Sequence, residues 1–252
     1  MQGEWLTISD AADCRMEGYY VKAADRSPAP TIILLQEIFG VNEAMRAVAH
    51  DFAKEGFAVL VPDLFWRVTP RIALSYSEPD RRRAGEIMRE FDTELGLVDL
   101  GHTVTWVRQR PNASRCLGAV GFCLGGKLAT ILGARGTVDI GVSFYGVQLN
   151  DYVGEIAEAK SPLLLHFGEL DTQIPLDLVH DIESAVAHND NVSIHIYSGA
   201  THGFFNSMRP ERHHPEAAAR SRTSTLEALR KTPIKVSNGS ASPLASMHRQ
   251  KA

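Results

Sequence analysis

A cysteine lies between glycines in the segment 121–126, which reads GFCLGG. The segment follows an apolar run and precedes a helical pattern, which is the setting of a nucleophile elbow, G-x-[SC]-x-G. The glycines suit this sharp turn because larger flanking side chains would clash. Cys123 would project above the carboxyl edge of a sheet, where the N-terminus of the next helix favours a thiolate and a developing oxyanion. The alternative is that Cys123 is a small buried apolar residue, as most free cysteines are.

A thiol nucleophile needs a base, and the base needs an acidic partner that orients it. In this architecture the chain order is nucleophile, acid and histidine. Asp171 lies in an acidic loop after an apolar run and is the best candidate for the acid, with Glu169 as its rival. His202 follows the alternating run 192–197, so we expect its imidazole at the same edge of the sheet. The alternative for His202 is a solvated loop histidine.

The segment 36–40, QEIFG, ends another apolar run and is expected at that edge too. Two backbone N–H groups are predicted to form an oxyanion hole: that of Leu124, directly after the nucleophile, and that of Ile38, in this early loop. Glu37 is an unusual neighbour for a thiol, because a carboxylate there would hold or take the thiol proton.

The sequence predicts no metal site. His166 lies inside an apolar run and is interpreted as structural, whereas His213 and His214 lie in a polar stretch and are interpreted as surface residues. No second pair of residues at metal-ligand spacing accompanies them.

Apolar runs and helical periodicity predict the elements that must position these residues. Strands alternate with helices along the chain, which predicts an α/β fold with a mostly parallel central sheet and helices on both faces. Residues 1–231 are predicted to form a single domain, and the polar tail 232–252 is predicted to be disordered. The predicted strands are 5–8, 19–23, 31–35, 57–61, 117–121, 138–145, 162–167 and 192–197, and the predicted helices are 42–55, 80–91, 94–110, 124–133, 177–188 and 216–231.

The composition restricts the partners. The chain has 252 residues, 44% of them hydrophobic, and a net charge of −4. Neither nucleic acid nor a membrane is therefore expected as a partner, and no apolar run is long enough for a membrane span. The cysteines Cys14, Cys116 and Cys123 form no C-x-x-C pair, and residues 1–5 lack a signal-peptide pattern. We expect free thiols, a cytoplasmic location, a small-molecule partner, and a monomer or small homo-oligomer.

The chain resembles the dienelactone hydrolase family of the α/β-hydrolase superfamily. The similarity lies in QEIFG at 36–40, VPDLF at 61–65, GFCLGG at 121–126, FYG at 144–146, GELD at 168–171 and ATHGF at 200–204. The resemblance implies a hydrolase with an α/β-hydrolase fold. Such an enzyme cleaves a lactone or carboxylic ester through an acyl-thiol intermediate, without cofactor or metal.

The resemblance also implies a catalytic triad of Cys123, His202 and Asp171. It implies further that Glu37 holds the proton of the resting thiol, and that the thiolate is released when a substrate carboxylate enters the site.

The substrate pocket departs from the family pattern, in which two arginines and a tyrosine bind a carboxylate. Arg81 aligns with one arginine, but Gly85 stands at the tyrosine position and Asn206 at the second arginine. Losing one bidentate contact should weaken carboxylate binding by about 2–5 kcal/mol. Either Arg209 substitutes or the substrate differs, and Arg81 is equally consistent with a solvated helix face.

Two alternative functions remain open: a carboxylesterase or thioesterase for a non-carboxylate substrate, and a non-catalytic scaffold in which Cys123 senses oxidants.

Overall fold

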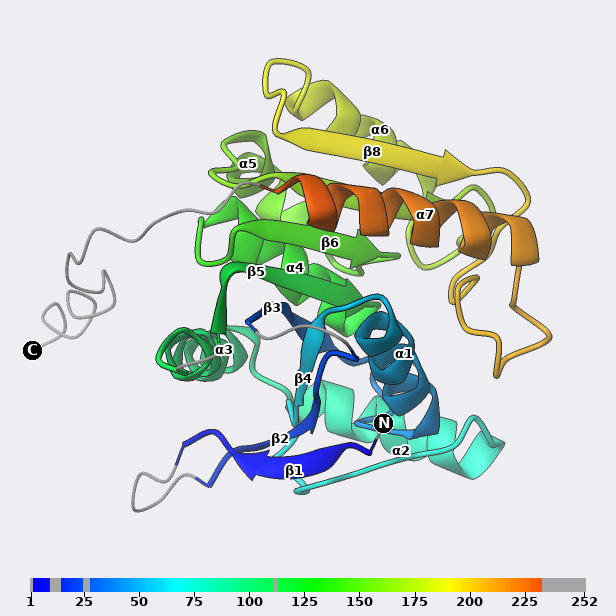
Figure 1. Cartoon of the computed structure of the whole chain (residues 1–252). Coiled ribbons are helices and arrows are strands. Elements are labelled where there is room, and N and C mark those ends of the chain that lie inside the picture. The colour runs from blue at the N-terminus through cyan, green and yellow to red at the C-terminus, as the bar shows by residue number, and fades with distance from the viewer. Residues whose placement is uncertain (1, 10–14, 25–27, 111–112, 233–252) are drawn as a thin grey trace, which may run out of the picture.

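An eight-stranded sheet forms the centre of the computed structural model, which describes residues 2–9, 15–24, 28–110 and 113–232 (Figure 1). The strand order is β1-β2-β4-β3-β5-β6-β7-β8. β2 pairs antiparallel with both β1 and β4, and all other neighbours are parallel, so the predicted mostly parallel sheet is confirmed. The strands are β1 (Glu4–Thr7), β2 (Glu17–Val21), β3 (Ala29–Leu35), β4 (Ala58–Pro62), β5 (Ala113–Phe122), β6 (Ile140–Phe144), β7 (Leu163–Gly168) and β8 (Val192–Tyr197).

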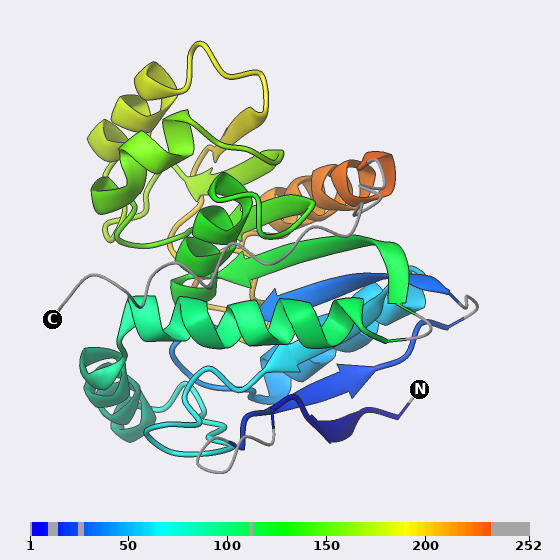
Figure 2. The same cartoon turned by 90° about the vertical axis from the view of Figure 1, so that its left-hand side faces the viewer.

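Helices cover both faces of the sheet, with α1 and α7 on one face and α3 and α4 on the other (Figures 1 and 2). The alternation of apolar side chains along β3 explains why both faces of the sheet are covered. Ile32 packs in one apolar cluster with Phe52 of α1, and Ile33 packs in the other with Leu128 of α4, because successive side chains of a strand point to opposite faces. The helices are α1 (Glu43–Lys54), α2 (Glu78–Glu90), α3 (Thr93–Arg108), α4 (Leu124–Ala134), α5 (Val153–Ala157), α6 (Leu176–Ala185) and α7 (Pro215–Lys231), with a 3₁₀ turn η1 (Asn150–Tyr152) before α5.

Side-chain caps fix where three of the helices begin. Asn42, Ser77 and Asp92 each accept a hydrogen bond from a backbone N–H in the first turn, of α1, α2 and α3 respectively. The cap at Ser77 makes α2 begin two residues earlier than the predicted helix 80–91. The sequence analysis also missed η1 and α5, because a helix of five residues is too short to show a periodic pattern.

Some predictions concern residues outside the described ranges. The tail from 233 onward and Cys14 are among them, whereas Cys116 and Cys123 are described and are buried. Among the described residues, no helix combines the length and the apolar character that crossing a bilayer requires.

Four loops at the carboxyl edge of the sheet bring the predicted chemistry together. Glu37 follows β3, Cys123 follows β5, Asp171 follows β7 and His202 lies in the loop after β8. In an open α/β sheet, the carboxyl ends of the strands are where ligands bind.

Candidate active site

Cys123 forms a strained turn between β5 and α4. Its φ of 55° lies in the left-handed region, and its ψ is −113°. A Cβ atom on Gly121 would lie 1.9 Å from the carbonyl oxygen of Gly125, and a Cβ atom on Gly125 would lie 2.2 Å from that of Leu35. Both obstacles are backbone atoms, so neither can move aside easily. The turn therefore has the geometry predicted for a nucleophile elbow, with Cys123 at the positive end of α4.

A change of Gly121 to alanine should be strongly destabilising. Gly121→Ala is expected to lower the free energy of unfolding by about 2 kcal/mol or more, because the added methyl group meets the backbone of α4. The matched control is Gly85→Ala, since an added Cβ in this part of α2 has no heavy atom within 4 Å. That control should raise the free energy of unfolding by about 0.5–1 kcal/mol. Equal effects of the two changes in urea unfolding would contradict this account of the elbow.

His202 and Asp171 form a buried hydrogen-bonded pair. The Nδ1 atom of His202 lies 2.8 Å from Oδ2 of Asp171, and both residues are buried. The backbone N–H of Gln173 donates to the other carboxylate oxygen at 2.9 Å, which fixes the orientation of the acid. With Nδ1 directed at Asp171, the Nε2 atom of the imidazole remains for proton transfer.

The pKa of His202 reflects its partners. Burial alone would lower this pKa, but hydrogen bonds to Asp171 and Cys123, together with the negative charge of each, outweigh burial and raise it to about 10. The thiol of Cys123 therefore lies within hydrogen-bonding reach of the imidazole.

The rival acid Glu169 serves a different role. Its carboxylate accepts hydrogen bonds from the hydroxyl of Ser198 at 2.7 Å and from the backbone N–H of Gly199 at 2.8 Å. These bonds tie the loop after β8 to the loop after β7. Asp171, and not Glu169, is the carboxylate that contacts His202.

Glu37 is buried in a polar network. It accepts hydrogen bonds from the hydroxyls of Tyr145 at 3.4 Å and Tyr76 at 3.5 Å, and from the amide of Asn206 at 3.5 Å. Burial raises the pKa of Glu37, although these hydrogen bonds and nearby positive charges oppose the rise. Within the described residues, no hydrogen bond joins Glu37 directly to Cys123.

Tyr145 is a site residue that our sequence analysis did not single out. Its ring lies 4.9 Å from the His202 ring, centre to centre, while its hydroxyl donates to Glu37. Tyr145 therefore lies between the imidazole and the buried carboxyl group. Its φ of 42° is unusual for a large side chain, and its N–H donates to the carbonyl of His166. The signal was its position directly after β6, at the carboxyl edge of the sheet.

The two predicted oxyanion donors lie at the same edge. Leu124 is the first residue of α4, where N–H groups have no partner within the helix. Ile38 lies in the turn that follows Glu37. A hydrogen bond of 3.0 Å from the N–H of Gly125 to the carbonyl of Gln36 holds the elbow against this turn.

The two predicted substrate-binding residues lie in different surroundings. Asn206 is buried, and its amide also donates to the hydroxyl of Tyr76 at 2.7 Å. Arg81 lies on α2 with 42% of its side chain exposed. Arg209, by contrast, is only 5% exposed, and its guanidinium lies 5.1 Å from the centre of the Tyr76 ring. Arg209 is thus the cation built into the site.

Lys127 is a second residue that our sequence analysis did not single out. It lies one turn along α4 from Cys123 and is only 3% exposed. Its Nζ atom donates to the hydroxyl of Thr93 and to the side-chain oxygen of Gln148, both at 2.9 Å. Burial lowers the pKa of Lys127, although nearby negative charges oppose this. The lysine connects α4 to the start of α3 and to the loop after β6.

The chain is similar to a known protein family over most of its length. The model of the dienelactone hydrolase family matches residues 16–232. The chain belongs to the dienelactone hydrolase family. The carboxymethylenebutenolidase of Pseudomonas putida is 36% identical over 188 residues, which cover 74% of this chain and 80% of that protein. Carboxymethylenebutenolidase 1 of Cupriavidus pinatubonensis is 32% identical over 237 residues, or 92% of this chain and 100% of that protein.

The fold of the dienelactone hydrolase family is also seen in solved structures. The crystal structure of dienelactone hydrolase from Anabaena variabilis superimposes with a TM-score of 0.64 at 19% identity, covering 90% of this chain and 95% of that one. The resemblance to the family and the α/β-hydrolase fold are thereby confirmed. The protein is a hydrolase of the dienelactone hydrolase type.

Proposed function

We propose that this protein opens an unsaturated γ-lactone that carries a carboxylate, through an acyl intermediate on Cys123. The observation that supports the proposal best is the meeting of Cys123, His202 and Asp171 from three separate loops, with 2.8 Å between His202 Nδ1 and Asp171 Oδ2. Similarity to carboxymethylenebutenolidases over most of the chain supports the same substrate class.

The first half of the reaction forms the acyl-enzyme. The thiolate of Cys123 attacks the lactone carbonyl carbon, and the N–H groups of Leu124 and Ile38 stabilise the oxyanion. When the tetrahedral intermediate collapses, the ring C–O bond breaks. The released enolate oxygen takes a proton from the imidazolium of His202. The former lactone is then held as a thioester.

The second half releases the product. His202, now neutral, takes a proton from a water molecule while the water oxygen attacks the thioester carbonyl. The C–S bond breaks, a dicarboxylic acid leaves, and Cys123 returns as a thiolate paired with the imidazolium. Asp171 accepts the Nδ1–H bond throughout and stabilises the charged imidazole.

Glu37 acts in this scheme as the proton store of the resting enzyme. Its raised pKa and its burial beside Tyr76, Tyr145 and Asn206 suit a carboxyl group that holds a proton when the site is empty. The ring of Tyr145 places this carboxyl group next to His202. When a substrate carboxylate enters the site, its negative charge strengthens the hold of Glu37 on this proton, and Cys123 is then present as the thiolate.

The substrate carboxylate is held by the cations near Asn206. Arg209 is the buried cation beside Glu37, and Arg81 approaches from α2. Arg209 thus supplies the charge that the family pattern places at position 206. Asn206 contributes a neutral hydrogen-bond donor.

The test compares kcat/KM for carboxymethylenebutenolide with that for its methyl ester. We expect the acid to be preferred by at least about tenfold, since one ionic contact to a partly buried arginine is lost in the ester. A preference for the ester would favour the carboxylesterase alternative. A protein that reacts once with peroxide and turns over neither compound would be a thiol sensor.

A further inference from the structure

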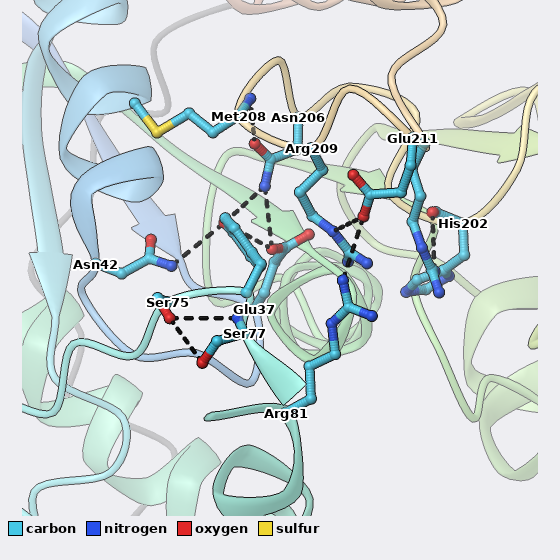
Figure 3. A network of polar contacts seen from close by, with 12 residues as sticks. Glu37, Asn42, Ser75, Ser77, Arg81, His202, Asn206, Met208, Arg209 and Glu211 are labelled. Carbon is cyan, nitrogen blue, oxygen red and sulfur yellow. Dashed lines mark hydrogen bonds and ion pairs between the residues drawn. The ribbon is translucent and has the colours of Figure 1, made fainter. Parts of the chain in front are cut away.

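Glu211 lies between the two cations of the proposed carboxylate subsite (Figure 3). A single oxygen, Oε1, is 3.2 Å from Nε of Arg209 and 3.4 Å from Nη2 of Arg81. Arg212 is close as well: it donates to the carbonyl of His202 at 3.2 Å, and its pKa is lowered by burial and by the charges of Arg209 and Arg81. Arg209 and Arg81 therefore share one carboxylate oxygen at this end of the site, and Arg212 adds a third positive charge nearby.

We propose that Glu211 is an internal counter-ion that occupies the carboxylate subsite of the empty enzyme and competes with the substrate for it. The inference rests on the proposed function, because it assumes an anionic substrate. Glu211 is then a specificity-determining residue: it weakens the binding of every carboxylate ligand and leaves neutral ligands unaffected.

Burial and exposure indicate which partner of this ion pair can leave. Arg209 is 5% exposed and lies against the rings of Tyr76 and Phe39, so its charge needs an anion nearby. The Glu211 side chain is 52% exposed and can turn into solvent without losing buried contacts. A planar ligand carboxylate can accept two parallel bonds from a guanidinium, whereas Glu211 offers both arginines the same oxygen.

Glu211 is charged wherever the enzyme would meet its substrate. Its own backbone N–H and the Arg209 side chain lower its pKa. The competition is therefore present across the neutral range, and it ends only when the carboxyl group is removed or neutralised.

The experiment measures the binding of furoate, a flat five-membered ring acid without a lactone bond, by titration calorimetry. Glu211→Gln should bind furoate about fivefold more tightly than the unchanged protein, the size of effect that one exposed ion pair can supply. Methyl furoate, which has no charge, should bind both proteins equally. The KM for carboxymethylenebutenolide should fall by a similar factor in the variant, with kcat unchanged.

The matched control is Glu78→Gln. Glu78 also pairs with an arginine on α2, at 3.0 Å from Arg82, and its loss changes the net charge by the same amount. This variant should bind furoate as the unchanged protein does. Equal tightening in both variants would mean a general charge effect and would overturn the proposal.

Two further results decide the matter. Adding Arg81→Gln to Glu211→Gln should remove part of the gain, because Glu211 competes for that cation too. Weaker furoate binding in Glu211→Gln alone would show that Glu211 positions Arg209 for the ligand, and the proposal would be wrong.

The furoate measurement does not need turnover. An enzyme that ignores lactones yet shows the tightening would overturn the proposed function and leave this inference standing.

Discussion

Cys123→Ala is expected to reduce kcat/KM for carboxymethylenebutenolide and for an activated aryl ester by at least about 10⁴-fold. Without the sulfur atom no acyl intermediate can form. The remaining oxyanion donors and His202 can then only assist a direct attack by water. The fold should survive, because alanine leaves the main-chain bonds of Cys123 in place, namely 3.0 Å to Phe144 and 3.1 Å from Lys127. Thermal unfolding of the variant checks this.

Cys116→Ala is the matched control for that change. Cys116 is also a buried cysteine, but it lies on β5 away from the elbow, and burial together with Asp139 raises its pKa to about 11. A thiol of this kind is unreactive at neutral pH. Its loss should leave kcat/KM within about twofold, since a substitution distant from the active site acts only through stability. Loss of activity in this variant, or retained activity in Cys123→Ala, would contradict the assignment of the nucleophile.

The second large effect is expected for Asp171→Asn, which should lower kcat about a thousandfold. The reason lies in the second carboxylate oxygen. The N–H of Gln173 donates to Oδ1 at 2.9 Å, so an asparagine keeps its carbonyl oxygen there and turns its NH₂ group toward His202. The NH₂ group then donates to Nδ1, and the imidazole proton moves to Nε2. In that tautomer His202 cannot accept a proton from the thiol or from water.

Glu169→Gln provides the comparison for Asp171→Asn. Glu169 lies two residues away in the same loop, but its partners are Ser198 and Gly199. Its loss should change kcat little and should lower stability only slightly, because the hydrogen bonds that it accepts are exposed to solvent. If kcat of Asp171→Asn stayed within tenfold of the unchanged enzyme, or if Glu169→Gln were the slower variant, Asp171 would not be the orienting acid.

The sequence was sufficient to predict the elements that carry the core of the site. Buried parallel strands are continuous apolar runs, so β3, β5 and β7 were recognisable, and the one or two residues that follow each of them had to lie at the same edge. That rule placed Glu37 and Cys123, and it placed Asp171 and His202 in the loops beyond. The glycine at position 121 also predicted the sharp turn at Cys123, because a larger side chain would clash there.

Other parts of the site depend on contacts that no local pattern contains. Tyr76 lies in a loop without periodicity, and its contacts with Arg209, Phe39 and Asn206, all distant in the sequence, bring it to Glu37. Arg209 is buried in the loop before α7, Arg81 is partly exposed on α2, and Glu211 contacts both, which is an arrangement between segments far apart in the sequence. Lys127 has the spacing of a surface lysine, and its burial follows from the approach of α3 and of the loop after β6.

The most direct measurement is the mass of the protein after acid quench during turnover of carboxymethylenebutenolide. A thioester on Cys123 predicts an increase equal to the mass of the whole lactone, since ring opening loses no atom. Peptide mapping should place the increase on the fragment that contains Cys123, and the Cys123→Ala protein should show none. An increase in mass that maps to a fragment without Cys123, or a Cys123→Ala protein that consumes the lactone at the unchanged rate, would contradict the account.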